Sequence, residues 1–194
     1  MSKKIYQLHI ALKWIKPPIW RRVQVPSDIT LHDLHKIIQT TMNWMNSHLH
    51  IFIVGNTTYG PSQNTLPFSK SIGEKNYEKV KISGVLKKPK DKIYYEYDFG
   101  DSWMHEVKLE KNLEPKPNKQ YPVCIKGERG APPEDCGGIP GYYELVDIIN
   151  DPDHPEHEEM KEFAGEDYDP EVCNIDYINE LLQTKNYGCF FESE

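Results

Sequence analysis

The chain opens with two alternating segments followed at once by a helical pattern, and this order limits the folds it can adopt. Apolar and polar residues roughly alternate over residues 5–14, KPP interrupts them, and IWRRVQVP resumes the alternation. Two such runs with a short break predict a β-hairpin. Apolar side chains then recur at helical spacing over residues 31–42, behind Thr30 as an N-cap with Asp33 three residues on. The opening therefore predicts strand, strand, helix.

Further strands are predicted after this helix. The candidates are HLHIFIVGNTTYG, KVKISGVL, IYYEYDF, MHEVKLEKNL and YPVCIKGE, with mostly loop between the first two, up to Asn76. In the first candidate, alternation places His48, His50 and Phe52 on one face. Together with the opening, these segments predict a β-grasp-like mixed sheet with one packed helix, in the order β-β-α-β-β-β.

The last third of the chain changes character. GYYELVDIIND, PEHEEMKEFAGE and NIDYINELLQ each carry apolar residues at helical spacing. Helices segregated after strands indicate the α+β class. We expect a single domain over residues 1–194, with a β-rich body (1–128, helix near 30–43), an ordered loop (129–141) and a small C-terminal helical cap (142–186).

Charge and composition narrow the partners and the location. The formal net charge of −7 disfavours a protein that coats nucleic acid or an anionic membrane, although a local basic patch stays possible. Acids far outnumber bases over residues 134–171. No apolar run approaches the length of a membrane span and the start follows a strand pattern, so we expect a cytoplasmic protein. Its four cysteines lack CxxC spacing and are expected to be reduced thiols.

The segment YYEYDFGDSWMH, residues 94–105, is one of two motifs that hold most of the chemical information. As a hairpin it places Tyr95, Tyr97 and Phe99 on one face and Tyr94, Glu96 and Asp98 on the other, with FGDS as the turn. Gly100 can then take positive φ, Asp101 can accept hydrogen bonds from backbone amides, and Trp103 can anchor the core. In the alternative interpretation, Asp98, Asp101 and His105 converge at a strand end and bind a divalent cation or perform acid–base chemistry.

The second motif is PPEDCGG, residues 132–138, directly before a predicted helix. Its glycines let the backbone approach another surface, and the following amides can hold an anion. Glu134 and Asp135 add to the candidate catalytic groups, and Cys136 is a candidate binding residue. The same two carboxylates oppose a thiolate, which disfavours Cys136 as a nucleophile. An ordered loop that closes over the sheet is the structural alternative.

Metal-ligating residue types are scattered through the second half of the chain. His105, Cys124, Cys136 and His154 are zinc ligand types, but their spacing matches no closed structural zinc pattern. Asp153 is expected to cap the helix that begins near Pro155.

PPIWRR is the best basic and aromatic cluster. Trp20, Arg21 and Arg22 suit a phosphate or an acidic partner, but strand alternation sends the two arginines to opposite faces.

Seven segments in order, over nearly the whole chain, carry a family resemblance. They are PPIWRR, TLHDLHKIIQTTMNW, HLHIF, YEYDFGDSWMHEV, GERGAPPEDCGG, GYYELVDIINDPDHPEH and FAGEDYDPE. The chain resembles the plasmid pRiA open-reading-frame-three-like family, whose members are also described as transposon-passenger, TnpR-like proteins of insertion elements. The resemblance implies one α+β domain in a mobile-element context, with no established activity. The family loop reads ACPPEDCGG and Ala131 replaces its first cysteine, which weakens a zinc site on Cys124 and Cys136.

These observations favour a non-catalytic binding module, associated with mobile elements, that holds a protein or small ligand through FGDSWMH and PPEDCGG. The first alternative is a metal-dependent hydrolase, with a divalent metal as its cofactor. Its candidate residues are Asp98, Asp101, His105, Glu134 and His154. A DNA-binding accessory protein ranks third because the net charge disfavours it.

Overall fold

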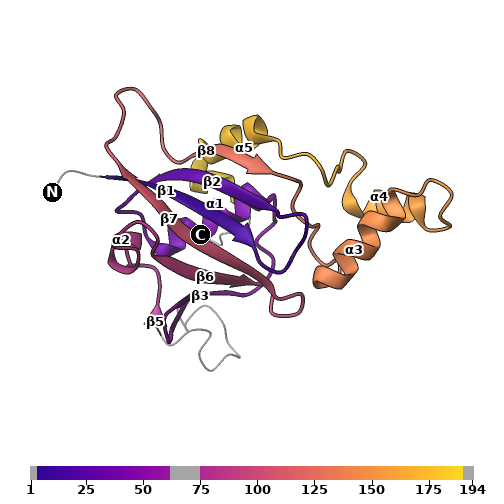
Figure 1. Ribbon diagram of the computed structural model, residues 1–194, viewed down its shortest axis with the longest axis horizontal. Coiled ribbons are helices and arrows are strands. Elements are labelled where there is room, and N and C mark those ends of the chain that lie inside the picture. The colour runs from indigo at the N-terminus through magenta and orange to yellow at the C-terminus, as the bar shows by residue number, and fades with distance from the viewer. Residues whose placement is uncertain (1–3, 62–74, 190–194) are drawn as a thin grey trace.

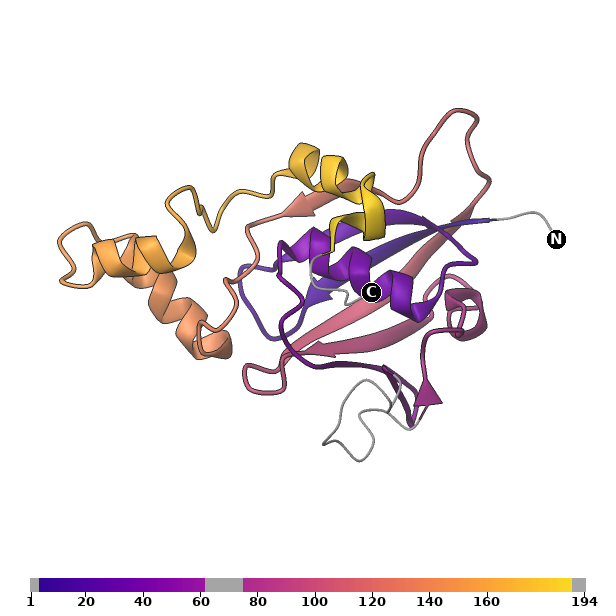
Figure 2. The same ribbon diagram turned by 180° about the vertical axis from the view of Figure 1, so that it is seen from behind.

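One eight-stranded sheet forms the centre of the molecule. The computed structural model describes residues 4–61 and 75–189. The strand order is β5-β4-β3-β6-β7-β1-β2-β8, and every neighbouring pair is antiparallel except the parallel pair of β4 with β5. Helix α1 crosses one face of this sheet. The helix lies behind the strands in Figure 1 and in front of them in Figure 2.

The bounds of the elements follow the chain order. The strands are β1 (Ile5–Leu12), β2 (Trp20–Pro26), β3 (His50–Val54), β4 (Thr57–Gly60), β5 (Lys75–Asn76), β6 (Lys92–Tyr97), β7 (Trp103–Leu113) and β8 (Val123–Glu128). The helices are α1 (Leu31–Met42), α2 (Ile82–Val85), α3 (Gly138–Ile149), α4 (His157–Ala164), α5 (Ile175–Leu182) and the short 3-10 helix η2 (Lys185–Gly188).

The predicted opening of strand, strand and helix is confirmed. β1 and β2 pair antiparallel, with Leu8 opposite Val23. α1 begins with the expected capping box: the Thr30 hydroxyl accepts a hydrogen bond from the Asp33 amide, and the Asp33 carboxylate accepts one from the Thr30 amide. The two bonds satisfy backbone and side-chain groups reciprocally, which fixes where the helix starts.

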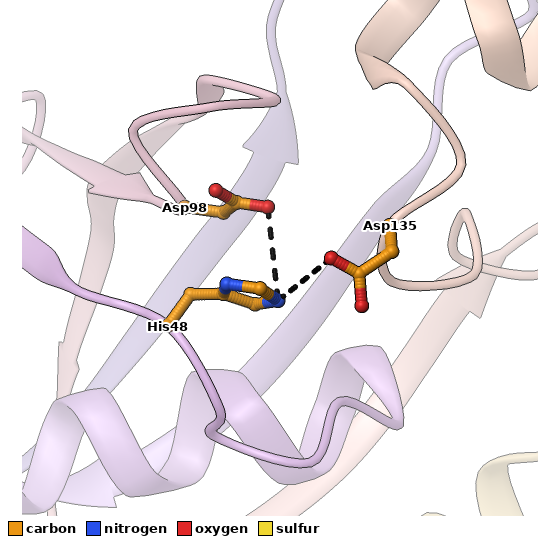
Figure 3. A group of neighbouring side chains, drawn as sticks. All are labelled: His48, Asp98 and Asp135. Carbon is orange, nitrogen blue, oxygen red and sulfur yellow. Dashed lines mark ion pairs between the residues drawn. The ribbon is translucent and has the colours of Figure 1, made fainter.

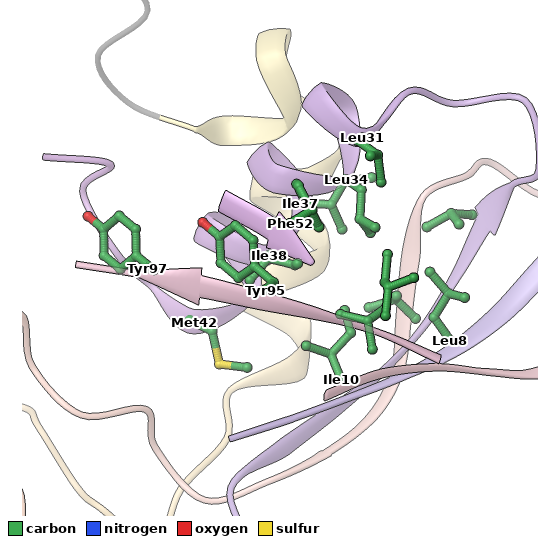
Figure 4. Close-up of a cluster of buried hydrophobic side chains, with 14 of the residues drawn as sticks. Leu8, Ile10, Leu31, Leu34, Ile37, Ile38, Met42, Phe52, Tyr95 and Tyr97 are labelled. Carbon is green, nitrogen blue, oxygen red and sulfur yellow. The ribbon is translucent and has the colours of Figure 1, made fainter. Parts of the chain in front are cut away.

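The core lies between the sheet and α1 (Figure 4). Leu34, Ile37 and Ile38 of the helix are fully buried against Leu8 and Ile10 of β1 and against aromatic residues of β3 and β6. The aromatic contributors are Phe52, Tyr95 and Tyr97. Burial of this apolar area is the main force that fixes the helix on the sheet.

Two strand predictions need correction. KVKISGVL was expected to be a strand, but residues 82–85 form the short helix α2, and only Lys81 makes a single bridge, to Thr30. Ile82 and Leu86 both reach the core from one helical turn, so the apolar spacing was compatible with either structure. HLHIFIVGNTTYG is two strands, β3 and β4, because Gly55 turns the chain at φ +60°. The loop expected before Asn76 falls mainly on residues 62–74, outside the described residues.

The C-terminal helices divide into two groups. α5 and η2 lie against α1 and the outer strand β8, whereas α3 and α4 extend away from the sheet as a pair (Figures 1 and 2). We call residues 138–164 the helical arm and the remaining described residues the sheet body. At the outer strand, the side-chain amide of Asn179 accepts a hydrogen bond from the Cys124 amide at 2.7 Å and donates one to the Cys124 carbonyl at 2.9 Å.

The α+β class is confirmed, with a mixed, mostly antiparallel open sheet and five α-helices among the described residues. The β-grasp assignment stays a prediction. The helical arm also starts earlier than expected, since α3 begins at Gly138, inside the segment assigned to an ordered loop. Within the described ranges, the helices are all too short or too polar to cross a membrane.

Candidate functional site

Three segments that are distant in sequence meet at one end of the sheet. They are residues 44–48 after α1, the β6–β7 turn, and the loop 132–137. Trp44 Nε1 donates a hydrogen bond to the Pro132 carbonyl at 2.8 Å, and the Gly137 amide donates one to Asp101 Oδ2 at 3.2 Å. The two signature motifs of the sequence are therefore in direct contact, and the segment after α1 joins them.

Hydrogen bonds of Glu134 connect the loop 132–137 to the segment after α1 and to the end of β6. Its carboxylate accepts hydrogen bonds from the Met45 amide at 2.7 Å and the Ser47 hydroxyl at 3.2 Å, and it forms a short bond with the Tyr97 hydroxyl. Burial, and then the Glu134 carboxylate, raise the pKa of Tyr97, so the phenol stays protonated and donates. The Glu134 oxygens are occupied by these donors.

Beside the hydrogen bonds of Glu134, three side-chain atoms of the types that bind metal ions lie close together. They belong to His48, Asp98 and Asp135 (Figure 3). His48 Nε2 lies 3.1 Å from Asp135 Oδ1 and 3.8 Å from Asp98 Oδ2. We call these three residues the cation site. In the described part of the chain, no other group of three or more His, Cys, Asp or Glu side chains has ligand atoms within 4.8 Å of one another.

Both carboxylates of the cation site stand on left-handed backbone. Asp98 has φ 55° and Asp135 has φ 60°, values that non-glycine residues adopt at a cost. Asp98 Oδ1 accepts a hydrogen bond from the Gly100 amide at 2.9 Å, which leaves Oδ2 directed at His48. Strained backbone of this kind persists where the surroundings hold it, and it places two carboxylates on one imidazole.

The His48 imidazole has an unsatisfied nitrogen. Nε2 is buried, and none of the described residues gives it a hydrogen bond of good geometry, although Asp135 lies close. Buried polar atoms without partners are rare and call for an explanation. Two ligands on a tetrahedral zinc ion lie about 3.4 Å apart, given bond lengths of about 2.0–2.2 Å. The two distances at Nε2 fall on either side of that value.

A buried network of polar side chains from α1 holds the segment that carries His48. The Asn46 amide donates to Gln39 Oε1 at 3.1 Å, and Asn46 Oδ1 is hydrogen-bonded to His35 Nε2 at 2.9 Å. His35 in turn stacks on His50 with ring centroids 3.5 Å apart, and its Nδ1 is bonded to the Tyr95 hydroxyl at 2.8 Å. Burial lowers the pKa of His35 strongly and that of His50 to about 3, so both rings are neutral.

Of the residues proposed from the hairpin motif, Asp98 joins the cation site, but His105 and Trp103 do not. Both are fully buried in the core. His105 Nδ1 is bonded to the Trp103 carbonyl at 2.9 Å, and burial lowers the pKa of the ring to about 4. Phe99, expected beside Tyr97, is 43% exposed because the chain turns at Asp98, and Asp98 takes the positive φ that was expected of Gly100.

The residues proposed from the loop and the cysteines have separate positions. Asp135 is in the cation site, and Asp101 receives the Gly137 amide. Cys136 is half-buried, and burial together with Asp101 raises the pKa of its thiol to about 12. Cys124 is a buried residue of β8, and burial raises its thiol pKa to about 11. Both cysteines, like the other two, are free thiols.

His154 lies in the connection between α3 and α4 of the helical arm. Its Nδ1 accepts a hydrogen bond from the Glu156 amide at 3.2 Å, so the ring caps a turn. The expected cap at Asp153 is wrong: α4 begins at His157, and Asp153 instead donates its amide to Asp151 Oδ1. The set of His105, Cys124, Cys136 and His154 makes no ligand group in the described part of the chain.

The basic cluster is committed to the structure. Arg21 is buried and donates to the backbone carbonyls of Thr41, Trp20 and Glu128. Arg22 lies on the opposite face, as alternation predicted, and makes a two-pronged ion pair with Glu110 at 2.7 and 2.8 Å. Trp20 Nε1 donates to Glu128 at 2.7 Å. The guanidinium groups therefore already have acceptors.

His48 is the site residue that sequence reasoning missed. Alternation within HLHIFIV assigned it to a strand face, but β3 begins at His50 and His48 belongs to the segment before it. The signal was its neighbourhood: a histidine between a turn-forming Asn46-Ser47 pair and a strand sits at an element boundary, where functional side chains are common.

Comparisons with known proteins agree with one another. Residues 4–177 match the protein family described as "Plasmid pRiA4b ORF-3-like protein". The chain is 33% identical to "Uncharacterized protein y4hQ" of Sinorhizobium fredii over 185 residues, which covers 94% of this chain and 92% of that protein. It is similar to the crystal structure of the protein of unknown function MM3350 from Methanosarcina mazei Go1, with a TM-score of 0.78, 37% identity, and coverage of 91% of this chain and 98% of that one.

Proposed function

The chain belongs to the plasmid pRiA4b ORF-3-like family, and on that premise we propose that it is a binding module whose ligand is held through a divalent cation at His48, Asp98 and Asp135. The convergence of one imidazole and two carboxylates from three separate segments carries this proposal. Such a ligand set suits zinc or manganese, whereas magnesium prefers oxygen ligands alone.

Three protein ligands leave coordination positions for an outside group. The Asp135 side chain is 68% exposed, whereas Asp98 is 12% exposed, so the site opens on the Asp135 side. A ligand that offers an oxygen or nitrogen donor can complete the coordination from that side. The outside group and the protein then share one ion.

The surroundings favour binding over catalysis. A metal-dependent hydrolase needs a general base that can reach the metal-bound water. Glu134 is the nearest candidate in the loop, but its oxygens already accept bonds from Met45, Ser47 and Tyr97. His105 and His154, proposed for the same role, lie outside the ligand group. The hydrolase is therefore the second candidate, supported only by the ligand set.

We extend the proposal to an association with mobile elements. The family description refers to a plasmid reading frame, which supports this context. A partner encoded by the same element is expected to supply the donor group. The DNA-binding alternative has less support, because Arg21 and Arg22 are held by protein acceptors.

Calorimetric titration of the chelator-stripped protein with Zn²⁺ and Mn²⁺ tests the proposal. We expect one equivalent to bind, and the Asp98→Asn and Asp135→Asn variants to lose at least about 100-fold in affinity, more than is typical for groups that only orient metal ligands. Asparagine tolerates left-handed backbone, so both variants keep the fold and remove only charge. A His48→Gln variant should lose affinity as well.

Matched controls are His154→Gln and Asp167→Asn, which remove an imidazole and an exposed carboxylate elsewhere. If they weaken binding as much as the site variants do, or if no cation binds, the proposal fails. Turnover in a hydrolase screen that requires the cation and is lost in Asp98→Asn would replace the binding module with the hydrolase.

A further inference from the structure

A second concave surface lies along the helical arm and shares only Asp135 with the cation site. It encloses about 340 Å³ between α3 and α4. Its apolar lining comes from both helices: Leu145, Ile148, Met160 and Phe163. Asp135 lines its inner end, so the groove begins beside the cation site but does not require a cation to form. We call it the arm groove.

Part of the apolar lining of the arm groove stays exposed in the folded protein. Leu145 and Ile148 of α3 are buried, but Met160 of α4 is half-buried and Phe163 is 46% exposed. α4 buries only His157 fully. An apolar strip that faces solvent between two helices is typical of a surface that receives another group.

The rim of the groove is negatively charged. Glu144 and Glu156 line it together with Asp135, whereas Lys161 of α4 does not. Between Glu134 and Glu171 the sequence holds fourteen acidic residues against that single lysine. Negative charges around an apolar recess attract a cationic ligand and repel anionic ones.

We propose that the arm groove binds a basic peptide segment that places an apolar side chain between α3 and α4 and its cationic groups on Glu144 and Glu156. Nucleic acid and anionic lipid surfaces are repelled by the same rim. A second copy of this chain is disfavoured, because a symmetric contact would set the acidic rim against itself. This inference does not rest on the cation site.

The arm is presented for such a contact. It stands clear of the sheet in both views of the molecule (Figures 1 and 2). Its first helix is tied to the body by Tyr143, whose hydroxyl donates to the Lys16 carbonyl at 3.0 Å and accepts from the Lys16 amide at 2.7 Å. Neither Tyr143 nor Lys16 lines the groove, so a ligand can occupy it without breaking that attachment.

The experiment measures fluorescence anisotropy of a labelled peptide of alternating lysine and leucine, in EDTA and at low salt. We expect binding that weakens steeply as salt rises. The double variant Glu144→Gln/Glu156→Gln should bind at least about tenfold more weakly, as should Phe163→Ser. The matched control for the double variant is Glu159→Gln/Glu162→Gln, which removes the same charge from exposed positions of α4 outside the groove. This control should change the affinity for the peptide by less than about twofold.

Other outcomes overturn the inference. Equal binding of the peptide with glutamate or serine in place of lysine would mark a purely apolar site. An equal loss in the control variant would mark bulk charge instead of the groove. Should Phe163→Ser fail to fold, the charge reversal Glu156→Lys at the exposed rim provides the same test. Light scattering that shows a dimer dissolved by Phe163→Ser would identify a self-interface and would also refute the proposal.

Discussion

The sheet body and the helical arm are built from similar amphipathic helices but use their apolar faces differently. α1, in the body, buries ten of its twelve residues, whereas α4, in the arm, buries only His157 of its eight. The apolar face of α1 meets the sheet, and the apolar residues of α4 meet one other helix and solvent. The body is therefore held by its own packing, whereas the arm leaves apolar surface exposed to solvent, as the proposed peptide contact requires.

The largest test of this comparison is the same substitution in each region. Leu34→Ala in the body should lower the free energy of unfolding by about 2–5 kcal/mol, because a fully buried leucine leaves a cavity that the sheet cannot close. Leu145→Ala in the arm, also buried, should cost less, since the two arm helices can relax. Urea denaturation measures both. Equal costs would show that the arm is packed as tightly as the body.

The buried histidine pair of the body should make stability depend on pH. Burial lowers the pKa of His35 strongly and that of His50 to about 3, from an unfolded value near 6.5. The unfolded chain therefore binds more protons below about pH 6.5, and stability falls as the pH drops from there toward 3, by a few kcal/mol in order of magnitude.

Urea midpoints measured between pH 7 and pH 4 check this dependence. His50→Gln should lose part of the slope, whereas His154→Gln in the arm should keep it. An unchanged slope in His50→Gln would assign the pH dependence to other groups, such as the buried His105 or carboxylates, instead of the stacked histidine pair.

The junction of the two regions is the next test. Gly138 has φ +68°, and a Cβ there would lie 2.8 Å from the Asp101 carbonyl oxygen. Gly138→Ala should cost about 1–3 kcal/mol from strain, with a further loss from the displaced turn. Gly55→Ala in the β3–β4 turn has a similar φ of +60° but open space around it, so it isolates the strain alone. Thermal unfolding should rank Gly138→Ala as the more damaging, and the reverse order would mean that the arm does not rest on the turn.

The smallest expected effect is at the surface of the arm. Phe163→Ser should change the free energy of unfolding by less than about 0.5 kcal/mol, because the ring is 46% exposed. A loss above about 2 kcal/mol in denaturant would show that Phe163 is a core residue of the arm. The contrast between body and arm would then disappear.

The fold was largely predictable from local patterns. The Thr30 and Asp33 capping box with its apolar stripe defined α1, and the alternation around KPP defined β1 and β2. The strand predicted for KVKISGVL was wrong because its few apolar residues fit a strand and a single helical turn equally well. The position of the arm, away from the sheet, could not be predicted, because helical spacing gives a face and no partner for it.

The candidate site was predictable only in part. Asp98 and Asp135 were found because acids beside glycine-rich turns are conspicuous in sequence. His48 was missed and His105 was proposed because alternation cannot tell which face of a strand is covered: His105 turned inward to the core, and His48 preceded the strand. Their separation depends on contacts between segments about 35 to 90 residues apart, such as the bond between Trp44 and Pro132, which no local pattern encodes.

The side-chain amide of Asn179 covers part of the open edge of the sheet at β8. It satisfies both peptide groups of Cys124 on the outer strand, and Gln183 donates to the Pro122 carbonyl nearby at 2.7 Å. An unpaired strand edge is a template for fibril-like growth, and here a side chain imitates the next strand and stops it. The plug comes 55 positions after the peptide group that it covers. Without α5 these peptide groups of β8 have no such cover, so a variant that keeps α5 from docking is expected to expose an edge that another strand can pair with.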